Sequence, residues 1–109
     1  MHLSEYQEKA KSTAVYPNIG ENIYYPALGL AAETGEVVNK IKKVMRDHDG
    51  IVTPEYKEIF KKELGDVLWY VAGLCTELDI DMAEVAEKNI EKLFSRKERG
   101  VLKGDGDDR

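Results

Sequence analysis

Apolar residues recur along this chain at intervals of three and four, the spacing that places them on one face of an α-helix. No segment alternates polar and apolar residues in the way a half-buried strand does. The two clearest helical stripes consist of Leu30, Val37, Ile41 and Val44, and of Phe60, Val67, Val71 and Leu74. The pattern therefore predicts an all-α fold.

Capping residues and prolines predict two helices in the first half of the chain. The first begins at Ser4 as N-cap, with Gln7 completing a capping box, and ends near Ala14 ahead of a proline. The second runs over about residues 25–46 and has Pro26 in its first turn. A connection rich in Asn, Gly and Tyr joins the two helices.

Two further helices are predicted in the second half. Thr53 is the expected N-cap of a helix that has a proline at its first position and ends near Leu78. Asp81 caps the last helix, which ends near Arg99, where the following Gly100 acts as a stop. The four helices are expected to form a bundle.

The composition indicates one small domain over residues 1–109, with a polar, glycine-rich tail at 101–109. Small domains leave much apolar surface uncovered, so we expect oligomerisation to complete the core. The formal charge of -5 argues against a nucleic-acid polymer as partner. Cys75 lies in an apolar run and is expected to be a buried thiol. With no apolar span near ~20 residues and no leader pattern, we expect a soluble, cytoplasmic protein without a membrane partner.

A five-residue pattern, acid-x-Gly-acid-Val, occurs twice, at residues 33–37 and 63–67. Acids three residues apart share a helix face, and an interior glycine suggests close backbone approach or a functional demand. Antiparallel packing of the two apolar stripes brings the acidic edges together. Such a group repels itself unless a hard divalent cation binds it, so a Mg²⁺ site with Mn²⁺ as a substitute is predicted. Its expected ligands are Glu33, Glu36, Glu63 and Asp66.

Neighbouring side chains supply candidates for substrate contacts. Lys40 and Lys43 continue the acidic edge and suit phosphates, whereas salt bridging of Lys40 with Glu36 is the alternative. Tyr70 lies one turn beyond the second motif and packs either against a sugar or into the core. Trp69 is expected to pack in the core or at a subunit interface, with base stacking as the alternative. The alternative for the acids themselves is a solvated, charged helix face.

The spacing of the acids resembles the magnesium-binding motif of the MazG-like nucleoside triphosphate pyrophosphohydrolases. In this chain it reads Glu33-x2-Glu36, then residues 37–62, then Glu63-x2-Asp66. Segments 13–17, 63–70, 89–93 and 104–109 also resemble the compact single-domain branch of that family. The resemblance implies an all-α fold completed in homodimers or homotetramers. It also implies hydrolysis of (deoxy)nucleoside triphosphates to the monophosphate and pyrophosphate, a role in nucleotide-pool maintenance.

The same resemblance makes Asn89 a candidate for hydrogen bonds to the sugar or base. Basic residues near the end of the chain are candidates for closing over phosphates, across a subunit boundary, with a solvated tail as the alternative. They are Arg96, Lys97, Arg99, Lys103 and Arg109.

One position departs from the family pattern. Many relatives have a second glutamate immediately before the first motif acid, where this chain has Ala32. The general base is therefore expected to be one of the four motif acids, with Glu36 as the candidate that orients water, or a metal-bound hydroxide. Two other functions stay open: phosphoribosyl-ATP pyrophosphohydrolase activity, and a non-catalytic, metal-binding helical interaction module.

Overall fold

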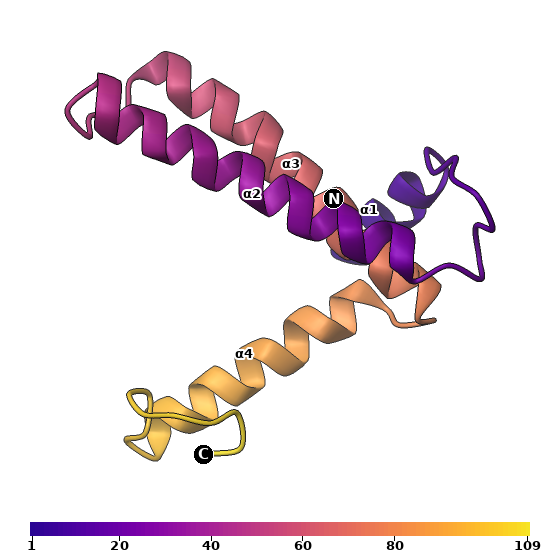
Figure 1. Cartoon of the computed structure of the whole chain (residues 1–109). Coiled ribbons are helices and arrows are strands. Elements are labelled where there is room, and N and C mark those ends of the chain that lie inside the picture. Colours follow the sequence, from indigo (N-terminus) through magenta and orange to yellow (C-terminus); the bar gives the residue numbers. More distant parts are fainter.

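The computed structural model describes all of residues 1–109 and contains four helices and no strand (Figure 1). The helices are α1 (Leu3–Lys11), α2 (Tyr24–Asp47), α3 (Pro54–Glu77) and α4 (Met82–Glu98). The predicted all-α class is confirmed. The helices α2 and α3 form a long antiparallel hairpin, and α1 packs against α3 near its C-terminal end. From there α4 projects away from the hairpin and makes no contact with α2 (Figure 1).

Local signals set the ends of α3 and α4 as predicted. The Thr53 side chain accepts a hydrogen bond from the Tyr56 amide at 3.2 Å. The Asp81 carboxylate accepts one from the Ala83 amide at 3.0 Å. At its other end α4 stops before Gly100, whose φ of +71° suits a residue without a side chain. These caps satisfy backbone groups that a helix leaves without partners.

The prediction for α1 was wrong at both ends. This helix begins at Leu3, has His2 as a cap without a side-chain hydrogen bond, and already ends at Lys11. At its end the hydroxyl group of Thr13 donates to the Ala10 carbonyl at 2.7 Å, in place of a further helical turn.

The side chains expected to form a capping box are used elsewhere. Ser4 Oγ donates to Asp81 Oδ1 at 3.0 Å. Gln7 Nε2 donates to the Ile80 carbonyl at 2.8 Å, and Gln7 Oε1 accepts from the Met82 amide at 2.8 Å. Ser4 and Gln7 therefore attach α1 to the turn between α3 and α4. These tertiary hydrogen bonds replace the predicted capping box.

Little of the chain is buried in its own fold. Only 7 of 109 residues are buried, and the core cluster consists of Ala10, Ala72, Cys75 and Met82. The buried Cys75 matches the prediction. The radius of gyration is 16.8 Å, against about 13 Å for a compact domain of this length. The accessible surface is 8124 Å², against about 6,100 Å² for a compact monomer.

Large apolar side chains face solvent along α2 and α4. They include Leu28, Val38, Ile41 and Met45 on α2, and Ile90 and Phe94 on α4. Ile41 was expected in the buried stripe but is 54% exposed, whereas Val44 is 3% exposed. Ile41 lies roughly 60° around the helix from Val44, beyond the edge that α3 covers. None of the four helices is both long enough and apolar enough to cross a membrane.

Candidate metal centre

Facing residues define the seam between the N-terminal half of α2 and the C-terminal half of α3. Each step of three or four residues back along α2 is matched by an equal step forward along α3, the register of antiparallel helices. The facing pairs are Asn22 with Glu77, Pro26 with Gly73, Gly29 with Tyr70, and Glu33 with Asp66. Along the seam, the contact between Asn22 and Glu77 is followed by small and aromatic residues and then by the carboxylates.

The carboxylates meet where the two repeated motifs lie side by side. One oxygen each of Glu33, Glu63 and Asp66 lies within 4.8 Å of the others. Lys40 Nζ lies 2.8 Å from Glu63 Oε1 and 3.6 Å from Glu36 Oε2. Glu36, with a 56% exposed side chain, stands outside the three-carboxylate group and is joined to it through Lys40. The salt-bridging alternative for Lys40 is thus the arrangement in this structure.

The electrostatics of this group favour a cation. Burial raises the pKa of Glu33 above its ordinary value, and the negative charges of Asp66, Glu63 and Glu36 add to the shift. The hydrogen bond to Glu63 raises the pKa of Lys40, so this side chain stays charged. A single ammonium group cannot neutralise four carboxylates. The seam therefore carries a net negative charge.

The donor atoms fit a divalent cation of the hard class. Mg²⁺ prefers oxygen ligands at about 2.1 Å, so ligand oxygens on one ion lie within about 4.2 Å of each other. The three carboxylate oxygens come within 4.8 Å of each other before any ion draws them in. Glu33, Glu63 and Asp66 are therefore the residues that can hold such an ion, and Glu36 can join them if Lys40 moves.

Aromatic side chains border the acids. A Cβ atom on Gly29 would lie 2.1 Å from Tyr70 Cε1, so the tyrosine ring rests directly on the backbone of α2. Burial raises the pKa of Tyr70, and the charges of Glu33 and Asp66 add to the shift. Tyr70 therefore lies half-buried beside the carboxylates. From this position the ring can pack in the core on one side and contact a sugar on the other, so both predicted roles stay possible.

Sequence reasoning missed Tyr6 of α1 as a neighbour of the site. Burial raises the pKa of Tyr6, and the charge of Asp66 adds to the shift. Tyr6 also packs against the core cluster together with Leu3. The apolar spacing of Leu3, Tyr6 and Ala10 was the available signal, since it marks the face of α1 that meets α3.

The motif glycines do not mediate a close approach within the chain. A Cβ atom on Gly35 or Gly65 would meet nothing within 4 Å. Of the two alternatives predicted for these glycines, close backbone approach is therefore not found within the chain. Close backbone approach occurs at Gly29 instead.

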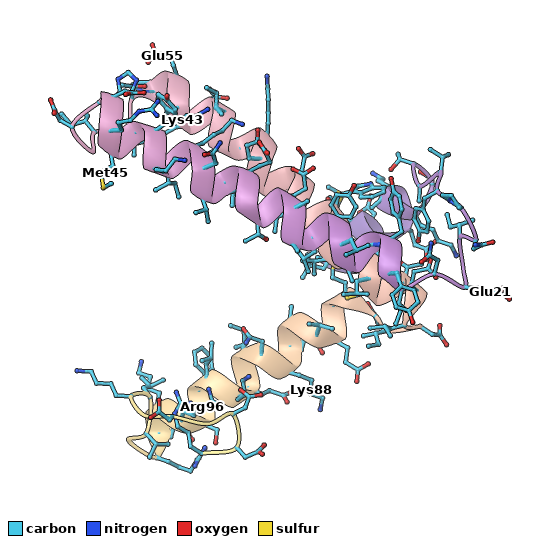
Figure 2. The ribbon with its side chains drawn as sticks, viewed as in Figure 1. Glu21, Lys43, Met45, Glu55, Lys88 and Arg96 are labelled. Atoms are coloured by element: carbon cyan, nitrogen blue, oxygen red, sulfur yellow. The ribbon has the colours of Figure 1, made fainter.

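The remaining candidates lie apart from the acids. Figure 2 shows Lys43 on the outer part of the hairpin, and Arg96 on α4, which projects away from it. Asn89 lines a groove of about 600 Å³ beside the turn between α3 and α4. Within one chain, neither Asn89 nor the basic residues of α4 reach the carboxylates. Trp69 Nε1 donates to Thr13 Oγ1 at 2.8 Å, and Trp69 packs on the core as expected.

The tail folds back on α4 although most of it is exposed: residues 102–108, Lys97 and Arg99 face solvent, as the solvated alternative had it, and Arg96 does not. Arg96 is 5% exposed, and its Nη2 donates to the carbonyl of Asp107 and, at 3.2 Å, to Asp107 Oδ1. Arg99 Nη2 donates to the Arg109 carbonyl at 2.8 Å, and the Arg109 guanidinium donates back to carbonyls of the tail, including Val101 at 3.0 Å. The tail therefore folds against the end of α4, and these arginines are its anchors.

Comparison with known proteins adds a family and a relative. The family profile described as MazG nucleotide pyrophosphohydrolase domain matches residues 26–101, which include both acid motifs. The Gene 37 protein of Mycobacterium phage L5 is 46% identical over 114 residues, an alignment that covers 100% of both chains. No solved structure matched the chain.

Proposed function

The chain belongs to the MazG nucleotide pyrophosphohydrolase family, and from this premise we propose that it hydrolyses (deoxy)nucleoside triphosphates to the monophosphate and pyrophosphate with Mg²⁺. Mn²⁺ is expected to substitute, and the cellular role is maintenance of the nucleotide pool. The observation that carries the proposal is the convergence of the Glu33, Glu63 and Asp66 carboxylates within the matched region.

The side chains divide the work as follows. Glu33, Glu63 and Asp66 would hold the ion, which when bound polarises phosphate oxygens and makes a water molecule more acidic. An incoming triphosphate competes with Glu63 and Glu36 for the Lys40 ammonium group, which is then drawn onto the leaving phosphates. Once Lys40 has moved, the exposed Glu36 carboxylate is available to accept a proton from the attacking water. Because position 32 is alanine, no extra glutamate is available there as a base. Glu36 is the one motif acid outside the three-carboxylate group, so it is our candidate for that role.

A second copy of the chain would complete the site. The apolar residues on α2 and α4 and the excess accessible surface support assembly as a homodimer or homotetramer. Asn89, Arg96 and Arg99 can serve the substrate only from another subunit, because α4 leaves its own hairpin. Arg96 is the weakest of these three candidates, since Asp107 already engages its guanidinium group.

A pyrophosphate-release screen over ribo- and deoxyribonucleotides tests the proposal. We expect pyrophosphate and the monophosphate with Mg²⁺, and no turnover in EDTA. Phosphoribosyl-ATP belongs in the screen, because its selective turnover would assign the chain to that related activity. Absence of pyrophosphate from every substrate would support a non-catalytic, metal-binding module instead.

Hydrolysis in oxygen-18 water locates the bond that is cut. We expect the label in the monophosphate, because an ion held by Glu33, Glu63 and Asp66 would act at the α-phosphorus, while Lys40 beside them would neutralise the departing end. Lys43 was expected to share this role, but it lies farther out on the hairpin. Label found only in pyrophosphate would mean attack at the β-phosphorus, contrary to this arrangement.

A further inference from the structure

One carboxylate at the end of α3 accepts several hydrogen bonds from the connection between α1 and α2. Glu77 accepts hydrogen bonds from the Tyr16 hydroxyl group, from the Gly20 amide at 2.9 Å and from the Asn22 amide at 3.1 Å. All three donors lie within residues 12–23. We call this arrangement the Glu77 latch. Charge-assisted hydrogen bonds of this kind are stronger than neutral ones, so the latch fixes the otherwise irregular connection.

A row of tyrosine rings leads from the latch toward the acids. Tyr16 stacks on Tyr25, with ring centroids 4.5 Å apart and planes at 11°. Tyr25 lies next to Tyr70, with centroids 6.5 Å apart. Tyr70 is one helical turn from Asp66 on α3 and rests on the α2 backbone at Gly29. The contacts are continuous from Glu77 to the wall of the carboxylate group.

Tyr25 is the middle ring of this row, between Tyr16 and Tyr70. Tyr25 is 42% exposed as a residue, so burial alone does not hold the ring. The flat stack on Tyr16 supplies the missing restraint, and the Glu77 latch holds Tyr16 in turn. On its open side, Tyr70 therefore has Tyr25 as a neighbour whose position is set from the end of α3.

Resting on the proposed function, we propose that Glu77 is a positioning residue that, through Tyr16 and Tyr25, fixes the Tyr70 ring as the wall on which the nucleoside of the substrate packs. A wall fixed in advance lowers the ordering entropy lost on binding. Because it contacts the nucleoside and not the reacting phosphorus, its effect falls on KM more than on kcat.

Kinetics of matched variants test this role. Glu77→Gln preserves size but removes the negative charge and replaces one of the two accepting oxygens with a donor group, whereas Tyr16→Phe removes one donor while keeping the stack. We expect Glu77→Gln to raise KM for the preferred triphosphate by about fivefold or more, with kcat within about twofold. Tyr16→Phe should also raise KM, but by a smaller factor than Glu77→Gln does. Thr53→Ala, which removes the N-cap at the opposite end of α3, is the control for lost stability and should leave KM unchanged.

A spectroscopic readout makes the test independent of turnover. In protein labelled with 3-fluorotyrosine, the Tyr70 fluorine resonance is assigned through Tyr70→Phe. It should shift or broaden in Glu77→Gln and Tyr16→Phe, but not in Thr53→Ala, while the Mn²⁺ affinity stays within about twofold in all three. An unchanged Tyr70 resonance in folded Glu77→Gln and Tyr16→Phe, or an unchanged KM, would overturn the proposal. If the wild-type chain hydrolyses no nucleotide, the proposed function fails, and the Tyr70 resonance alone decides whether Glu77 positions the ring.

Discussion

Asp66 and Glu36 occupy equivalent places in the repeated motif, but the packing of α2 on α3 gives them different surroundings. Asp66 belongs to the three-carboxylate group, whereas Glu36 stands outside it. We expect Asp66→Asn and Glu36→Gln each to lower turnover by about 100-fold or more while the protein stays helical. Without metal, Asp66→Asn should also raise the melting temperature, because it removes one of the repelling charges. Pyrophosphate release, circular dichroism and thermal melts in EDTA measure these effects.

The matched control is Glu58→Gln, on the same helix but away from the seam. Its carboxylate pairs only with exposed Lys61, so neither activity nor stability should change appreciably. Near wild-type turnover in both Asp66→Asn and Glu36→Gln would show that the metal site lies elsewhere.

Gly29 offers a sharper test of packing at single-residue scale. In Gly29→Ala the new methyl group would collide with the Tyr70 ring, so the ring or the helix must move. Overpacking of this kind costs about 1–3 kcal/mol, more than the ~0.5–1 kcal/mol that alanine gains over glycine in a helix. We therefore expect a net loss of stability by chemical denaturation and a higher KM.

Gly73→Ala on α3 is the comparison. Its Cβ atom would lie 3.5 Å from Pro26 Cβ, an ordinary van der Waals contact. The same change of residue should here stabilise the protein by about 0.5–1 kcal/mol. Equal effects of Gly29→Ala and Gly73→Ala would contradict the close approach of Tyr70 to α2.

At the scale of elements, the Glu77 latch makes the attachment of the connection to α3 depend on pH. Burial acts to raise the pKa of Glu77, but its hydrogen bonds from Tyr16, Gly20 and Asn22 outweigh burial and leave the pKa below its ordinary value of 4.5. A carboxyl group with a lowered pKa stabilises the fold above its unfolded-state pKa, and this contribution disappears as pH falls through the folded-state value. We expect the difference in unfolding free energy between wild type and Glu77→Gln to be constant from about pH 6 to 8.

Below about pH 4.5 that difference should shrink as the Glu77 carboxylate takes up a proton. Denaturant titrations at several pH values measure it, with Glu58→Gln as the flat reference. Tyr16 does not interfere in this range, because burial and the hydrogen bond to Glu77 raise its pKa to about 12. A difference that grows toward acid pH would contradict the latch.

The elements differ in how far the sequence determines them. The ends of α2, α3 and α4 fall within one residue of prediction, because a proline, Thr53 and Asp81 act locally. The α1 prediction failed because Ser4 and Gln7 have long-range partners that no local pattern reveals. The acid group was predictable in large part because packing the two apolar stripes against each other sets a register in which the motifs meet, although Glu36 stays outside the group. Tyr6 and the Glu77 latch were not, since both arise from contacts between segments distant in sequence.

At the scale of the whole molecule, the chain is more open than a compact monomer of its mass. It extends over 44 × 42 × 26 Å, and its surface exceeds that of a compact monomer by about 2,000 Å². That excess is comparable to the surface that stable homodimers bury. We expect light scattering to give a multiple of the 12.3 kDa chain mass, and the melting temperature to rise with protein concentration. A compact monomer at micromolar concentration would contradict this expectation.

The contact between Gly29 and Tyr70 also has a consequence for how such chains diversify. Because the tyrosine ring fills the space that any side chain at position 29 would need, substitutions at the two positions are coupled. A descendant that gains a side chain at position 29 loses stability unless the ring at position 70 is exchanged for a smaller group. Since that ring is the proposed wall of the nucleoside site, this pair of substitutions is a route by which the lineage can change its preferred substrate while keeping its four carboxylates.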